Sequence, residues 1–124
     1  MKLAVLVSGN GTNLQSIIDA IKGGYLTDVE ISYVVSSNPN ALALRRAENN
    51  GIRTLTISRK NMLEELKKIF LQVDIVVLAG FLWIIPDDLL GIRPIINVHP
   101  SLLPLFGGKG MFGTKVTEAH FFRT

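Results

Sequence analysis

The chain has 124 residues, 48% of them hydrophobic, and a mean hydropathy of +0.35, so we expect one globular domain over residues 1–124 with a sizeable core. The net charge of +3 comes from scattered basic residues, a pattern that favours a solvated surface over a nucleic-acid interface. The absence of Cys excludes a disulfide framework and a thiolate metal site. No apolar stretch is long enough for a membrane span and no signal start is present, so we expect a cytoplasmic protein.

Strand and helix patterns alternate along the chain. The predicted strands cover residues 2–8, 29–36, 52–57, 74–80 and 95–98. The predicted helices between the first four strands cover residues 14–21, 41–50 and 61–70, and one helical turn is expected at 87–90. This alternation predicts an α/β fold, with a Rossmann-like open parallel sheet, right-handed crossovers and helices on both faces.

Two segments carry more detailed expectations. Four apolar residues of the third helix are expected to face inward: Leu63, Leu66, Ile69 and Phe70. Four basic residues on or near it are expected to face solvent: Arg59, Lys60, Lys67 and Lys68. After a glycine-rich loop over residues 106–113, we expect a short helix that passes through Val116 and Ala119 and ends at Phe122.

Asn97 and His99 lie at the end of a β-branched, apolar strand pattern and are followed at once by Pro100. Strand side chains alternate, so both residues are expected on one face of the sheet. The proline ends ladder pairing, which places the pair at the carboxyl end of the strand, where open α/β sheets bind ligands. A His that moves a proton to or from an amine, beside an Asn amide that donates to an oxyanion, suits acyl transfer. The structural alternative is a buried Asn and His satisfied by the backbone.

Residues 9–13, Gly-Asn-Gly-Thr-Asn, join the first strand to the first helix. Backbone N–H groups and a helix N-terminus meet at such a turn, and Thr12 and Asn13 can add side-chain donors for an anion. The dinucleotide fingerprint requires a third Gly where Leu14 stands and an acidic residue after the second strand. A P-loop requires a Gly-Lys-Ser/Thr sequence that is absent. A monophosphate site is therefore favoured, and the alternative is a plain turn that caps the helix.

Residues 81–86, Phe-Leu-Trp-Ile-Ile-Pro, form an unusually apolar segment directly after the fourth strand. Such a segment either covers the core or lines a flat, apolar ligand slot.

Four motifs together resemble the phosphoribosylglycinamide formyltransferases. They are SGNGTNL, LAGF, NVHPSLLP and GGKGM, at residues 8–14, 78–81, 97–104 and 107–111. The resemblance covers nearly the whole chain and implies the N-terminal part of a formyltransferase fold. It also implies the activity: transfer of a formyl group from 10-formyltetrahydrofolate to the amine of glycinamide ribonucleotide, a step of purine biosynthesis.

The resemblance further implies roles for individual residues. Gly11, Thr12 and Asn13 correspond to residues that hold the substrate phosphate. The expected folate contacts are Arg59, Leu82, Trp83, Ile84, Ile85 and Asn97. Asn97 is also expected to contact the formyl oxygen, and His99 to act as the general acid. Trp83 stands where an Arg is common in the family.

Members of this family usually continue beyond this length and carry there a catalytic Asp that tunes the equivalent of His99. Asp87 and Asp88 belong to another segment, so we expect a C-terminally incomplete domain with low or no turnover when the chain acts alone. An open sheet edge at residues 95–98 is expected to promote homodimers or aggregates. The expected partners are small-molecule substrates, without nucleic acid or membrane. The alternatives are a formyltetrahydrofolate hydrolase, another folate-dependent formyltransferase, or a non-catalytic nucleotide-binding fragment.

Overall fold

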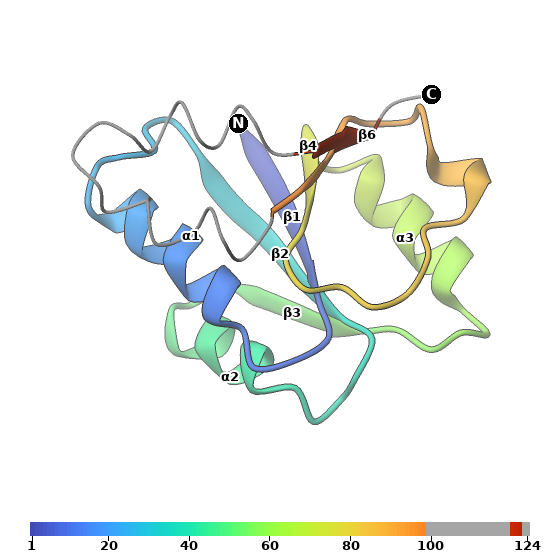
Figure 1. Ribbon diagram of the computed structural model, residues 1–124, viewed down its shortest axis with the longest axis horizontal. Helices are drawn as coiled ribbons and strands as arrows, with labels where there is room; N and C mark the ends of the chain where they lie inside the picture. The colour runs from blue at the N-terminus through green and yellow to red at the C-terminus, as the bar shows by residue number, and fades with distance from the viewer. Residues whose placement is uncertain (99–119, 123–124) are drawn as a thin grey trace.

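The computed structural model describes residues 1–98 and 120–122, which form one six-stranded sheet with the strand order β3-β2-β1-β4-β5-β6 (Figure 1). The strands are β1 (Lys2–Val7), β2 (Glu30–Ser36), β3 (Arg53–Thr56), β4 (Ile75–Leu78), β5 (Ile95–Asn97) and β6 (His120–Phe122). The helices are α1 (Thr12–Lys22), α2 (Leu42–Asn49) and α3 (Met62–Phe70), with a 3₁₀ turn η1 (Asp87–Leu89). The first five strands are parallel, which confirms the predicted Rossmann-like architecture.

Helices cover both faces of the sheet, as predicted. On one face, α1 and α2 pack against Val5 and Val7 of β1. On the other face, α3 and η1 pack against Ala4 and Leu6 of the same strand. Alternate residues of β1 are therefore buried in two separate core clusters, one on each face of the sheet. This explains why the sequence of the strand is a continuous apolar run. No helix among residues 1–98 and 120–122 has the length and apolarity that crossing a membrane would require.

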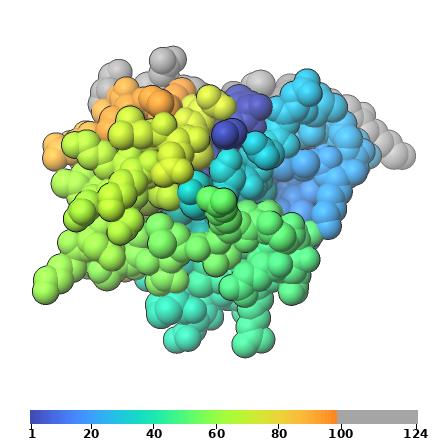
Figure 2. Space-filling view, turned by 180° about the vertical axis from the view of Figure 1, so that it is seen from behind, coloured from blue at the N-terminus to red at the C-terminus, as the bar shows by residue number. Residues whose placement is uncertain are grey.

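The strand order reverses between β1 and β4, because the chain first builds outward through β2 to β3 and then returns to the other side of β1. From behind, the amino-terminal end of the chain lies between the segments of β2 and β4 (Figure 2). The carboxyl ends of β1 and β4 meet in register at Leu6 and Leu78. In open α/β sheets, a ligand crevice forms beyond this switch point.

The predicted helix up to Phe122 is wrong at its end, because His120–Phe122 forms strand β6. Val116 and Ala119 lie outside the described residues. The strand β6 runs antiparallel to β5, pairing Ile95 with Phe122 and Asn97 with His120. Aromatic residues favour extended backbone, and this pairing satisfies backbone groups along β5. The open edge predicted at residues 95–98 is therefore also wrong, because β6 occupies it.

The third predicted helix is confirmed, and Leu66, Ile69 and Phe70 are buried as expected. Leu63 is the exception, with 40% of its surface exposed. It lies in the first turn of α3, where Met62 instead packs against the core. In the first turn of α3 the inward position is therefore taken by Met62, and Leu63 lies at the exposed margin of the apolar stripe.

Candidate functional site

Gly11 sets the approach of the α1 N-terminus to α2. The residue is buried and left-handed, with φ 82°, and a Cβ on it would lie 2.6 Å from the Cα of Ala43 and 2.7 Å from its Cβ. No L side chain fits at that distance from another backbone. The glycine required by the motif is therefore explained by packing between two helices as well as by its conformation.

The loop before α1 is held by polar contacts, one of which uses the first N–H group of the helix. The side-chain oxygen of Asn10 accepts a hydrogen bond from Thr12 N (3.1 Å), and its carbonyl accepts one from Arg46 Nε (2.8 Å). Intrahelical bonding begins with Gln15 N, which donates to Gly11 O at 2.8 Å. The N–H groups in the first turn before Gln15 have no acceptor within the helix, and they lie at the positive end of its dipole. We call residues 9–13 the anion loop.

The anion loop lies beside the exit of β4. The side-chain nitrogen of Asn13 lies 3.9 Å from the position that a Cβ of Gly80 would take. Ser8, at the carboxyl end of β1, accepts a hydrogen bond at its Oγ from Leu82 N at 2.9 Å. Its Oγ also lies 2.6 Å from the Oγ of Ser37, which follows β2. These contacts place the residues after β1, β2 and β4 around one point.

Residues 81–85, which we call the apolar segment, alternate between the core and solvent. Phe81, Trp83 and Ile85 pack on the core beneath α3 and η1. Leu82 and Ile84 are 82% and 87% exposed. Phe81, Trp83 and Ile85 thus cover the core, whereas Leu82 and Ile84 are free to form a ligand surface.

Two of the predicted folate contacts, Trp83 and Arg59, lie against each other. The Trp83 ring lies edge-on to Phe81, with a centroid separation of 6.2 Å. The guanidinium carbon of Arg59, which precedes α3, lies 4.6 Å from the Trp83 ring centroid, within the range of a cation–π contact. The structure therefore places Arg59 beside the apolar segment, and its role as a folate contact stays a prediction.

Asn97 is half-buried at the carboxyl end of β5, in register with Leu78 of β4. Ile95, two residues earlier, belongs to the core cluster that also contains Ile85. Because strand side chains alternate, Asn97 lies on the same face of the sheet as that cluster. His99 lies outside the described residues, so its expected place beside Asn97 stays a prediction.

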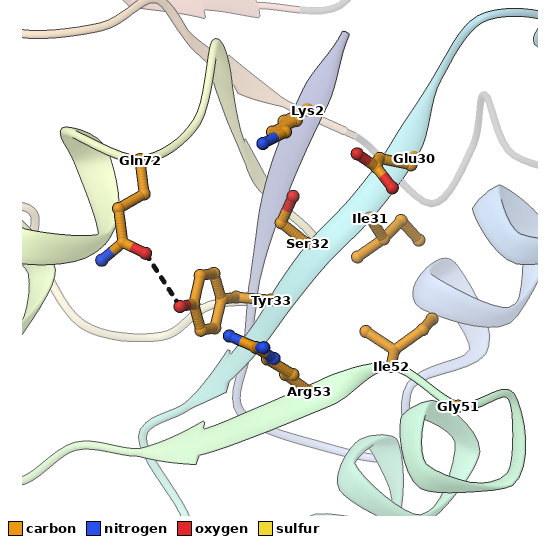
Figure 3. Close-up of a pocket in the computed structure, with 9 residues that line it drawn as sticks. All are labelled: Lys2, Glu30, Ile31, Ser32, Tyr33, Gly51, Ile52, Arg53 and Gln72. Carbon is orange, nitrogen blue, oxygen red and sulfur yellow. Dashed lines mark hydrogen bonds between the residues drawn. The ribbon is translucent and has the colours of Figure 1, made fainter.

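A pocket of about 370 Å³ lies at the opposite edge of the sheet, around the amino ends of β1, β2 and β3 (Figure 3). Lys2, Glu30 and Arg53 contribute charged groups to it, and the hydroxyl of Tyr33 donates a hydrogen bond to Gln72 Oε1 at 2.9 Å. All of these side chains are at least partly exposed. The pocket is remote from the switch point, so we place the functional site at the carboxyl edge, where the anion loop, the apolar segment and Asn97 gather.

Sequence reasoning missed Ser8, Ser37 and Arg46 as supports of this site. The Ser8–Leu82 contact joins residues 74 apart, and the Arg46–Asn10 contact joins residues 36 apart. The only local signal was a polar residue directly after a buried strand. Such a residue indicates the edge of the sheet where ligands bind, but it does not predict which distant residues will hydrogen-bond to it.

The anion loop lies beside the apolar segment at the switch point of a parallel sheet, which is where Rossmann-like folds bind their ligands. Residues 1–118 match the family described as formyl transferase, and the chain belongs to that family.

Three relatives illustrate the similarity. The chloroplastic phosphoribosylglycinamide formyltransferase of Vigna unguiculata is 40% identical over 130 residues, covering 95% of this chain and 41% of its own. The phosphoribosylglycinamide formyltransferase of Escherichia coli K12 is 39% identical over 118 residues, covering 87% and 55%. The crystal structure of glycinamide ribonucleotide transformylase 1 from Geobacillus kaustophilus has a TM-score of 0.68 at 35% identity, covering 94% and 67%. The chain spans about half the length of the two curated relatives.

Proposed function

We propose that this chain supplies the groups that transfer a formyl group from 10-formyltetrahydrofolate to the amine of glycinamide ribonucleotide, in purine biosynthesis. The observation that carries the proposal is the meeting of three features at one edge of the sheet. The anion loop follows β1, the apolar segment follows β4, and Asn97 ends β5. The names of the relatives from Vigna unguiculata and Escherichia coli support the same activity.

The anion loop fits a phosphate monoester. In the first turn of α1, Thr12 N donates to Asn10, while the N–H groups of Asn13 and Leu14 have no acceptor within the helix. The exposed Thr12 and half-buried Asn13 can add side-chain donors. We therefore assign Gly11, Thr12 and Asn13 to the phosphate of glycinamide ribonucleotide. Gly11 would contribute through its backbone, because the direction that a side chain would take is filled by α2.

The apolar segment and Arg59 fit a flat heteroaromatic ring with acidic substituents. Leu82 and Ile84 present apolar side chains to solvent, and the partly exposed Trp83 adds an aromatic surface. Ile85 would shape this surface from below, since it is nearly buried. The guanidinium of Arg59 lies over Trp83 and can meet a carboxylate. We assign this surface, with Asn97, to the formylfolate.

The chemistry proposed for this site is acyl transfer between two nitrogens. The amine of the ribonucleotide attacks the formyl carbon, forming a C–N bond, and the bond from that carbon to the folate nitrogen breaks. The attacking nitrogen loses one proton and the leaving folate nitrogen gains one, so the transfer is balanced. The side-chain N–H of Asn97 would donate to the formyl oxygen as negative charge develops there. The role of His99, giving a proton to the leaving nitrogen, is proposed from the motif alone.

Transfer and hydrolysis are separated by the fate of a labelled formyl group. With the purified 124-residue chain, we expect label to appear in the ribonucleotide product only slowly, in keeping with the low turnover expected above, and little free formate when the amine substrate is omitted. Ribose 5-phosphate should bind more tightly than ribose, because the anion loop recognises the phosphate. Formate release that is independent of the amine would instead support a hydrolase. Equal affinity for the two sugars would remove the phosphate assignment.

Self-association and cytoplasmic localisation stay predictions from the sequence. Because β6 occupies the outer side of β5, a dimer would have to use another surface. Sedimentation of the purified chain tests the predicted self-association, and a monomer at all concentrations would contradict that prediction.

A further inference from the structure

The hydroxyl of Ser8 joins the two halves of the candidate site. Ser8 is buried, directly follows β1, and leads into the anion loop. Its Oγ accepts the N–H of Leu82 in the apolar segment at 2.9 Å and lies within hydrogen-bond distance of the Ser37 Oγ at 2.6 Å. A hydroxyl has one proton and two lone pairs, so both contacts can form at once.

The anion loop has restraints that do not involve the Ser8 side chain. The carbonyl of Gly9 accepts a hydrogen bond from Ala43 N at 3.2 Å, which ties the loop to α2. Arg46 and the side chain of Asn10 add the two further contacts described above. Removing the Ser8 hydroxyl should therefore leave the loop in place.

The backbone of the apolar segment depends more directly on Ser8. The Leu82 N–H donates to this hydroxyl at the end of β1, while the Leu82 side chain is almost fully exposed. Loss of the acceptor would leave a partly buried N–H without its partner, which is costly enough for the backbone to shift. Phe81 and Trp83, on either side of Leu82, would move with it.

We propose that Ser8 is a positioning residue whose hydroxyl holds the apolar segment in register with the anion loop. In this way a single side chain sets the relative placement of the two ligand surfaces. The contact itself is independent of any substrate, but its consequence for folate affinity rests on the proposed function.

Trp83 is the single tryptophan of the chain, so its fluorescence reports the apolar segment without labelling. In Ser8→Ala, we expect a red-shifted emission maximum and stronger quenching by acrylamide than in the wild type. Ser32→Ala is the matched control, because it removes a half-buried serine hydroxyl at the amino edge of the sheet. The control should leave Trp83 emission unchanged.

A second pair of variants tests the same contact from its donor side, without altering the buried serine. Leu82→Pro removes the N–H, whereas Leu82→Ala keeps it and shortens a side chain that is already exposed. The proline variant should reproduce the Trp83 shift of Ser8→Ala, and the alanine variant should not. This pair decides the question even if Ser8→Ala fails to fold. Trp83 emission unchanged in Leu82→Pro would overturn the proposal.

Two ligand probes distinguish positioning from a general loss of structure. In Ser8→Ala, affinity for folic acid should fall roughly threefold to tenfold, as expected for one lost hydrogen bond, while affinity for ribose 5-phosphate is retained. Equal losses for both ligands would argue against a positioning role. If the wild type binds neither probe, the proposed function fails, while the Trp83 comparison still decides the role of Ser8.

Discussion

The guanidinium of Arg59 stacks over the ring of Trp83 at 4.6 Å, joining the loop before α3 to the segment after β4. An exposed cation–π contact is worth about 0.5–1 kcal/mol, so its removal should alter Trp83 more than it alters global stability. We predict that Arg59→Ala shifts Trp83 fluorescence and weakens folic acid binding, with little change in the urea midpoint. Lys60→Ala, at an adjacent exposed position, is the control. Identical Trp83 spectra for the two variants would contradict the contact.

The packing of Gly11 against Ala43 predicts a large cost for the smallest possible substitution. Gly11→Ala combines a strained left-handed residue with a clash against the backbone of α2, and should destabilise the fold by roughly 2–4 kcal/mol. Gly9→Ala is the matched control, because a Cβ there meets nothing within 4 Å. Urea unfolding should separate the two variants clearly. Weak phosphate binding by Gly11→Ala alone would not establish a ligand contact, since the same change disturbs the helix.

Asn97 offers a direct test of the acyl-transfer chemistry. Asn97→Asp keeps the shape of the side chain but replaces the N–H donor by a carboxylate, which would oppose negative charge on the formyl oxygen. We predict a fall in single-turnover transfer of about 10²–10³-fold, with near-normal ribose 5-phosphate binding. Asn40→Asp, in an exposed turn, carries the same charge change as a control. Retained turnover in Asn97→Asp would exclude this residue as the oxyanion donor.

Two adjacent residues at the end of α3 should differ greatly in their effect on stability. Phe70 is fully buried, and Phe70→Ala should cost about 3–5 kcal/mol through lost burial and the cavity left behind. Leu71 is 60% exposed, and Leu71→Ala should change stability by less than about 0.5 kcal/mol. Thermal unfolding of both variants measures the difference. Similar melting temperatures would contradict the placement of the α3 core stripe.

Patterns with a strong period carried the fold prediction. Leu14, Ile17 and Ile18 recur at helical spacing and are all buried in α1. The apolar run of β1 correctly indicated a strand covered on both faces. The alternation of Phe81, Trp83 and Ile85 with exposed residues after β4 was not predicted, because every residue from 81 to 85 is apolar and the sequence there carries no period.

The remaining features depend on contacts that no local window contains. Strand β6 has three residues, too few for a period, and forms by pairing with β5 more than twenty residues earlier in the chain. Leu63 has the spacing of its buried neighbours, but Met62 packs against the core in its place in the first turn of α3. The Ser8–Leu82 bond likewise arises only once β1 and β4 are adjacent.

The position of β1 bears on how the protein folds as it is synthesised. In the finished sheet β1 lies between β2 and β4, and Lys2 N donates to the carboxylate of Asp74 at 2.7 Å, 72 residues further along. On the ribosome, β2 emerges soon after β1, but β4 follows only after two more crossovers. The central strand of the mature sheet is therefore an edge strand of the nascent chain, and its unpaired, apolar side is open to chaperones until Ile75–Leu78 has emerged.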